Sequence, residues 1–246
     1  MNKIVFFLFA LMCSLGAYAT ETVITTDSAD VKTEEVRSSM RIIEQKVRAA
    51  AVKVSTAGGG HGSGSVVRYK DISVVFTAQH VADGMVGDFY KISKNDKQTI
   101  GMLVYSDPVH DIAMIYMPKD LQTVAPMKFA PTDEIIKVGT EITYSGYPSD
   151  HRLMTFNGKV AGYEFIPGRG IQIILHTHGW FGSSGSGVYD SKGRMVGILW
   201  GIDIESRASG QVVENIIWIS PINNVQMKYA LSVICVALEG APKACK

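Results

Sequence analysis

The sequence lacks several features that would assign it to a specialised class of protein. Its formal net charge is only +1, which argues against a strongly basic nucleic-acid binder. It has three cysteines, too few near histidines to form a metal site. Apart from the N-terminal residues, the longest apolar tract is 229–238, which is too short to cross a bilayer as a helix. What remains is a globular chain of 246 residues, 46% of them hydrophobic, long enough to bury a sizeable core.

The N-terminus has the pattern of an export signal. Lys3 precedes an apolar run over residues 4–15, and Ala17-Tyr18-Ala19 follows the small-x-small pattern of a cleavage site. We expect cleavage after Ala19, a signal peptide over 1–19, and a secreted or periplasmic mature chain without stable membrane insertion. The alternative is an uncleaved membrane anchor, but the apolar run is short for a spanning helix.

Removal of the signal peptide leaves two cysteines, Cys235 and Cys245, ten positions apart. In an oxidising compartment they are able to form one disulfide. The alternative is a pair of free thiols, one of them packed in a helix.

A helix is expected ahead of the strands. Thr33 followed by Glu34 and Glu35 is typical of a helix start. Apolar residues then recur on one face as far as Val47, so the pattern predicts a helix to about Arg48. We expect it to pack against the outside of the following domain. An inhibitory pro-segment over the same residues is the alternative.

From residue 49 onward, short apolar and β-branched runs alternate with turn residues, which predicts an all-β chain. The pattern divides into a first β-barrel over 49–128 and a second over 129–220. A polar segment and helix occupy 20–48, and a C-terminal helix and tail occupy 221–246. Pro221 is expected to open that helix, because proline fits a first helical turn. Residues 58–64 are expected to form a loop.

Three separated blocks carry residues suited to acyl transfer. Gly182 to Gly187 surrounds Ser184 with glycines, so that the amides of Gly182 and Ser184 can converge on one spot beside the hydroxyl. His80 ends an apolar strand run, and Asp111 precedes another. A serine hydroxyl needs a neutral imidazole to take its proton, and the imidazole needs a carboxylate to orient it.

These blocks resemble the trypsin-like (chymotrypsin-fold) serine peptidases, in particular their bacterial V8-type and HtrA branches. Thr77-Ala78-Gln79-His80 is similar to the family's T-A-x-H block, residues 111–113 to its D-[IL]-A block, and residues 182–187 to its G-x-S-G-[GS]-P block. The likeness extends over about residues 49–225. It implies two perpendicular six-stranded β-barrels and a serine endopeptidase that hydrolyses polypeptides through an acyl-enzyme, without a cofactor or metal.

The resemblance also implies a role for each site residue. Ser184 is the nucleophile, His80 the base and then the acid, and Asp111 the residue that orients His80. The amides of Gly182 and Ser184 form the oxyanion hole. Leu199, Trp200 and Gly201 pair with the substrate backbone, and His178 lines the specificity pocket.

Three positions depart from the family pattern. Gly187 stands where proline is usual, which touches no reacting group. Ser183 replaces the aspartate that pairs with a newly cut N-terminus in trypsin-like zymogens, and Leu199 stands where V8-type relatives carry a glutamate-recognising histidine.

Of the other histidines, we expect His61 to be solvated and His110 to be a poorer base than His80. The alternatives are a catalytically silent peptide-binding module on the same fold, or an esterase using the same site. The sequence does not indicate an oligomeric state.

Overall fold

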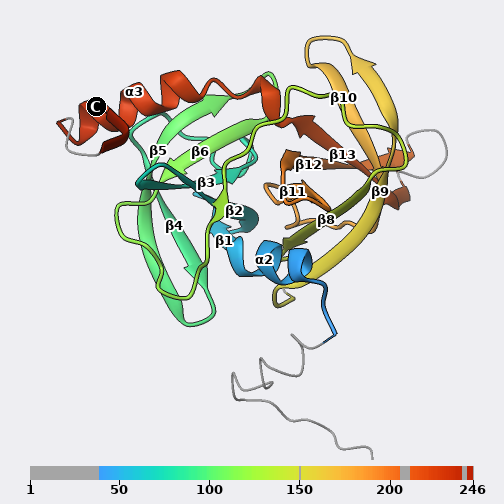
Figure 1. Ribbon diagram of the computed structural model, residues 1–246, viewed down its shortest axis with the longest axis horizontal. Coiled ribbons are helices and arrows are strands. Elements are labelled where there is room, and N and C mark those ends of the chain that lie inside the picture. The colour runs from blue at the N-terminus through green and yellow to red at the C-terminus, as the bar shows by residue number, and fades with distance from the viewer. Residues whose placement is uncertain (1–38, 150, 206–210, 240–242, 246) are drawn as a thin grey trace, which may run out of the picture.

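Two closed β-barrels lie side by side in the computed structural model (Figure 1), which describes residues 39–149, 151–205, 211–239 and 243–245. The expected signal peptide, its cleavage site and the expected helix start at Thr33 lie outside these residues. None of the described helices is long and apolar enough to span a membrane.

The first barrel closes six antiparallel strands in the order β1-β4-β5-β6-β3-β2, with β1 paired to β2. A short strand, β7, adds in parallel to β2. The strands are β1 (Ala51–Ser55), β2 (His61–Tyr69), β3 (Ile72–Thr77), β4 (Phe89–Lys94), β5 (Lys97–Asp107), β6 (Ile112–Tyr116) and β7 (Met127–Lys128). Their inward side chains, among them Val54, Val75 and Ile115, are completely buried.

The second barrel closes in the order β10-β13-β12-β11-β8-β9. Its strands are β8 (Glu141–Gly146), β9 (Met154–Ile166), β10 (Gly170–His176), β11 (Gly187–Asp190), β12 (Met195–Glu205) and β13 (Gln211–Pro221). Tyr144, Leu175 and Ile219 fill its interior. The predicted all-β fold of two six-stranded barrels with two helices is therefore confirmed.

Helix α2 (Ile42–Ala50) lies beneath the junction of the two barrels (Figure 1). It is shorter than expected, because residues 39–41 are not helical. Its start is fixed by Glu44, whose carboxylate accepts the Arg41 amide at 2.8 Å, an arrangement that satisfies one of the free amides of a helix start. Arg41 also donates to Glu141 in β8 at 3.0 Å, and Asn157 in β9 donates to Glu44 at 2.9 Å. The helix runs directly into β1, so it joins the first barrel to the second.

Helix α3 (Met227–Ala237) leads from the second barrel back across the first (Figure 1). Its Ala230 and Ile234 are buried in a cluster with Val104 of β5. The expected helix opening at Pro221 is wrong, because Pro221 ends β13, where it pairs with Gly197, and a single 3₁₀ turn, η1 (Ile222–Asn224), follows.

The C-terminal residues are fixed to the first barrel. Cys235 in α3 and Cys245 form a disulfide, with their Cα atoms 5.5 Å apart. A second 3₁₀ turn, η2 (Lys243–Cys245), places two amides against Asp71, those of Lys243 at 2.7 Å and Ala244 at 2.8 Å. Residues 243–245 are therefore attached at two points.

The glycine-rich run 58–64 is only partly a loop. β2 begins at His61, and residues 61–64 pair with β1, with His61 opposite Ser55 and Gly64 opposite Val52. Its glycines fit close packing, since a Cβ on Gly64 would lie 2.6 Å from a methyl group of Val75. The composition indicated a loop, but the pairing with β1 decides the conformation.

If α2 is part of the folded unit, replacing Val47, which is 1% exposed, with alanine will lower the free energy of unfolding by about 2 kcal/mol through lost apolar burial. Ile42→Ala on the same helix, where the side chain is 72% exposed, will change it by less than about 0.5 kcal/mol. Urea denaturation followed by circular dichroism measures both. Equal effects at the two positions would show that α2 does not pack as described.

Candidate active site

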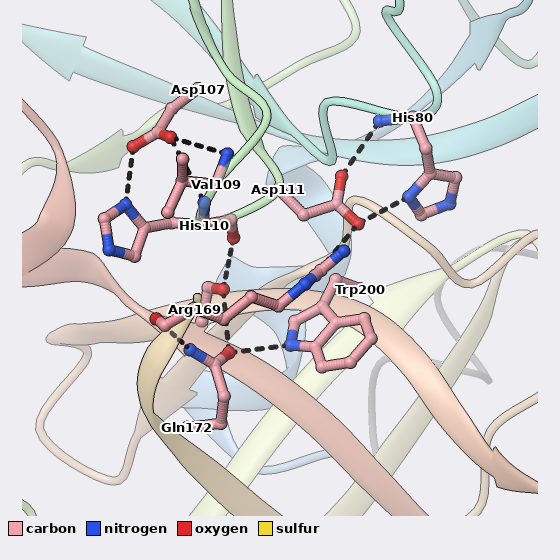
Figure 2. A network of polar contacts seen from close by, with 9 residues as sticks. His80, Asp107, Val109, His110, Asp111, Arg169, Gln172 and Trp200 are labelled. Carbon is pink, nitrogen blue, oxygen red and sulfur yellow. Dashed lines mark hydrogen bonds and ion pairs between the residues drawn. The ribbon is translucent and has the colours of Figure 1, made fainter. Parts of the chain in front are cut away.

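Two of the predicted site residues, His80 and Asp111, contact each other at one edge of the first barrel (Figure 2). His80 follows β3 and Asp111 immediately precedes β6, and these strands pair with Thr77 opposite Ala113. His80 Nδ1 lies 2.8 Å from Asp111 Oδ2, and the His80 amide donates to Asp111 Oδ1 at 2.9 Å. One carboxylate thus holds both the backbone and the ring of the histidine, which leaves Nε2 for another partner.

The Asp111 carboxylate is almost completely buried, with its side chain 6% exposed. Burial opposes ionisation, but the hydrogen bonds from His80 and the positive charge of Arg169 outweigh it and hold the pKa of Asp111 below its ordinary value. An ionised carboxylate in this position orients the imidazole and stabilises it when it takes up a proton.

The loop that carries Ser184 belongs to the second barrel but is held by the first. Ser63 in β2 donates from its amide to the Ser184 carbonyl at 2.7 Å and from its Oγ to the Gly182 carbonyl at 2.7 Å. Within the second barrel, the Gly185 amide donates to the Leu199 carbonyl at 2.7 Å. The loop is therefore fixed on both sides.

Ser184 lies beside the segment that carries His80. A Cβ placed on Gly62 would be 2.4 Å from the Val81 side chain and 2.9 Å from the Ser184 carbonyl, so these groups meet over one glycine. Among the described residues, Ser184 Oγ makes no direct hydrogen bond with His80. In ligand-free enzymes such a contact is often long and shortens when substrate binds.

The residues before Ser184 form a turn whose geometry suits an anion site. The Ser183 amide donates to the Trp180 carbonyl at 3.0 Å, and Gly182 has φ +90°, which is typical of a type II turn with glycine at its third position. The Phe181 carbonyl accepts the Ser149 amide at 2.6 Å. Because the peptide bond is trans, the Gly182 N–H points to the opposite side from that carbonyl.

The predicted substrate strand needs one correction. Leu199 is 1% exposed, its amide donates to the Ser186 carbonyl at 3.0 Å, and its carbonyl accepts the Gly185 amide. Both backbone groups therefore bond the loop of Ser184. Trp200 is the extra residue of a β-bulge between Leu199 and Gly201, so the part of β12 open to a ligand begins at Trp200.

His178 lies at an open hollow of about 540 Å³ formed with residues 211–215. Its Nδ1 is 3.4 Å from Glu214 Oε2, in a pair that is about half exposed. Its ring lies against Phe156, with ring centres 5.5 Å apart. The specificity role of His178 remains a prediction.

Two other histidines, His110 and His61, have hydrogen-bond partners of their own outside the His80–Asp111 pair. His110 Nδ1 lies 2.7 Å from Asp107 Oδ2, on the side of the loop away from His80 (Figure 2). His61, expected to be solvated, has Nε2 3.0 Å from the Tyr147 carbonyl, and a Cβ on Gly182 would lie 3.1 Å from the same nitrogen. His61 therefore packs against the turn of residues 180–183, because β2 begins at His61. The described part of the chain contains no group of three or more histidine, cysteine or acidic side chains suited to a metal ion.

A family model described as a trypsin-like peptidase domain matches residues 62–198. This chain belongs to the trypsin-like peptidase domain family. The matched region contains His80, Asp111 and Ser184.

Known members of the trypsin-like family show the extent of the likeness. The chain is 28% identical over 160 residues to a glutamyl endopeptidase of Staphylococcus epidermidis, covering 58% of this chain and 55% of that protein. It is 27% identical over 167 residues to a glutamyl endopeptidase of Staphylococcus aureus strain MW2, covering 61% of this chain and 50% of that protein. The chain thus spans about half the length of the curated relatives it matches.

Solved structures share the trypsin-like fold. The active form of the Rv3671c protease from M. tuberculosis aligns with a TM-score of 0.59 at 18% identity, over 77% of this chain and 83% of that chain. The HtrA-type protease AlgW with a tripeptide aligns with a TM-score of 0.60 at 22% identity, over 80% of this chain and 62% of that chain.

Several residues around this trypsin-like site were not predicted from the sequence. Ser63 stands in the glycine-rich run that was expected to be a loop, so the sequence did not indicate it as a strand residue that faces the second barrel. Arg169 and Gln172 lie in and after the β9–β10 turn, far along the chain from the three motif blocks. Their contacts with Asp111 and Trp200 are long-range, and no local pattern indicates them.

The close approach of the two barrels gives a stability prediction. A Cβ on Gly185 (φ +92°) would lie 2.1 Å from the Ser63 carbonyl oxygen, so Gly185→Ala will lower the free energy of unfolding by about 3 kcal/mol or more through strain and overpacking. Gly139 (φ +85°) has no atom within 4 Å of such a Cβ, and Gly139→Ala will cost about 1 kcal/mol. Denaturant titration compares the two variants. A Gly185→Ala protein as stable as Gly139→Ala would contradict the described contact.

Proposed function

We propose that this protein is a serine endopeptidase that hydrolyses peptide bonds through an acyl-enzyme. One observation carries the proposal: Ser63 holds the loop of Ser184 against the same barrel edge that carries the His80–Asp111 pair. A nucleophile, a base and a group that orients the base are therefore gathered from both barrels, as acyl transfer requires.

In this mechanism Ser184 Oγ attacks the substrate carbonyl carbon as its proton passes to His80 Nε2. Asp111 stabilises the imidazolium that results. The tetrahedral intermediate collapses when the leaving amine takes that proton from His80, which leaves an ester on Ser184. Water, deprotonated by His80, then attacks the ester, and His80 returns the proton to Ser184 Oγ as the acid leaves.

The oxyanion is assigned to the amides of Gly182 and Ser184. Neither amide donates to a backbone carbonyl among the described residues, so both are available to a developing negative charge. Removing one such donor typically costs roughly 3 kcal/mol of transition-state stabilisation.

The order of this loop does not depend on an aspartate at position 183. The Ser63 hydroxyl donates to the Gly182 carbonyl and accepts the Tyr147 amide at 2.8 Å. Thr77 Oγ1 in turn donates to the Ser63 carbonyl at 2.7 Å. These buried bonds support a loop that forms on folding, so removal of the signal peptide is the only cleavage we expect activity to need.

A polypeptide substrate is expected to add as a strand along Trp200 and Gly201, because an extended peptide can pair with an open strand. The hollow at His178 and Glu214 is a candidate site for one substrate side chain. The glutamyl endopeptidases are named for their own preference, and Leu199 lies in the barrel core here, so a glutamate preference is not carried over.

The proposed location is outside the cytoplasm, as a secreted or periplasmic protein cut after Ala19. The disulfide of Cys235 and Cys245 supports this proposal, since disulfides persist in oxidising compartments.

Replacing Ser184 with alanine will reduce hydrolysis of a peptide library by at least about a thousandfold, because no other group supplies the nucleophile. The rate is measured on the full chain by mass spectrometry of the cleaved peptides. Circular dichroism will show an unchanged fold.

Ser186→Ala is the matched control, since Ser186 is a second serine of this loop and is fully buried, and it will keep most of the activity. An active Ser184→Ala protein would contradict the assignment. A wild-type protein that binds peptides without cutting them would show a silent module, and one that cleaves only activated esters would show an esterase.

A further inference from the structure

The turn between β9 and β10 carries an arginine into the candidate active site. Residues 166–169 form a turn in which the Arg169 amide donates to the Ile166 carbonyl at 2.9 Å. Pro167 and Gly168 (φ +84°) occupy its centre, which is the sequence and conformation of a type II turn. The turn is therefore encoded locally, and it directs Arg169 back toward the first barrel.

The guanidinium of Arg169 lies between Asp111 and the Trp200 ring (Figure 2). Its Nη1 is 3.7 Å from Asp111 Oδ2, and its Cζ is 4.3 Å from the centre of the Trp200 ring. Nη1 is buried and makes no hydrogen bond with any described atom, so its contact with Asp111 is purely ionic. Stacking on an indole face stabilises a guanidinium in such a position.

A buried glutamine keeps these groups together. Gln172 is 0% exposed, and its Nε2 donates to the Arg169 carbonyl at 3.1 Å. Its Oε1 accepts Trp200 Nε1 at 2.9 Å and lies 3.0 Å from Ser220 Oγ. Ser220 Oγ also contacts the His110 carbonyl, next to Asp111. Gln172 thus connects the arginine turn to Trp200 and, through Ser220, to the loop that carries Asp111 (Figure 2).

We propose that Arg169 is a positioning residue that acts on His80 through Asp111. This inference rests on the proposed function, because it assigns His80 as the base. The guanidinium and the His80 ring share one oxygen, Asp111 Oδ2. A permanent cation there weakens the stabilisation that Asp111 gives to a protonated His80. Arg169 therefore keeps His80 neutral, and able to accept the serine proton, at lower pH than Asp111 alone would allow.

The other charged groups nearby do not substitute for Arg169. Among the described residues, His80 forms an ion pair with Asp111 alone, and Asp111 forms ion pairs with His80 and with Arg169 from the β9–β10 turn. Asp107 and His110 share the loop, but they bond each other on its far side (Figure 2).

The test is an NMR titration of the His80 imidazole in the full chain. Replacing Arg169 with methionine will raise the midpoint of that titration by roughly half a pH unit, the effect expected of one partly exposed charge. Arg169→Gln, a second neutral variant, will do the same and decides the question if Arg169→Met does not fold. Arg169→Lys keeps the charge without the planar stack, and its midpoint will stay near that of the wild type.

Arg68→Met is the matched control. Arg68 pairs with Asp120 at 2.9 Å on the surface of the first barrel, so this variant removes the same charge without touching the site, and the midpoint will not move. An unchanged midpoint in both neutral variants of Arg169 would overturn the proposal, as would an equal rise in Arg68→Met.

Kinetics provide a second readout. In Arg169→Met the acidic limb of kcat/KM will move to higher pH by the same amount as the NMR midpoint. A limb that stays in place while hydrolysis slows would indicate a merely structural role. The NMR titration needs no hydrolysis, so a chain that cuts no peptide would refute the proposed function while the midpoint still decides the role of Arg169.

Discussion

The candidate site depends on a single contact between the barrels, the one that Ser63 makes with the loop of Ser184. Its amide and hydroxyl donate to the carbonyls of Ser184 and Gly182. A buried serine side chain and a buried carbonyl must both be paired, because an unpaired polar group in the interior costs free energy. The barrels therefore cannot separate or slide here without losing these bonds, and this constraint fixes the loop relative to His80.

The two helices and the 3₁₀ turn η2 lie outside that contact and fix the barrels and the C-terminal segment. α2 connects β1 to β8 and β9 through Arg41 and Glu44. α3 crosses from the end of β13 onto β5, and η2 attaches the C-terminal residues to Asp71. Each barrel is closed on itself, so the segment of α2 supplies polar contacts to the second barrel that strand pairing alone does not give. α3 and η2 fix residues 243–245 to the first barrel. The candidate site therefore lies at the junction of the two barrels.

Local sequence patterns were sufficient for the β-architecture and for the candidate residues. The strand that precedes His80 and the one that begins after Asp111 were recognisable because apolar, β-branched runs are flanked by turn residues. The same reasoning failed where tertiary contacts override local preference. β2 extends into a glycine-rich run because β1 is there to pair with it, and Pro221 completes β13 because its partner strand extends that far.

The contacts around Asp111 were not predicted, for a different reason. Arg169 is presented by a recognisable turn, but the turn does not reveal what the side chain meets across the molecule. Gln172 and Ser220 have no local signature at all, since their roles follow from barrel closure. For a site built from two barrels, the sequence therefore predicts the motif residues but not the residues that hold them in place.

The most direct measurement of the central claim is to locate the adduct formed by a fluorophosphonate probe. The wild-type chain is labelled, digested and mapped by mass spectrometry, beside a His80→Ala variant. The account predicts a single adduct on Ser184 in the wild type and almost none in the variant, since an unassisted serine hydroxyl reacts slowly. An adduct on Ser183 or Ser186, equal labelling of both proteins, or no labelling would contradict it.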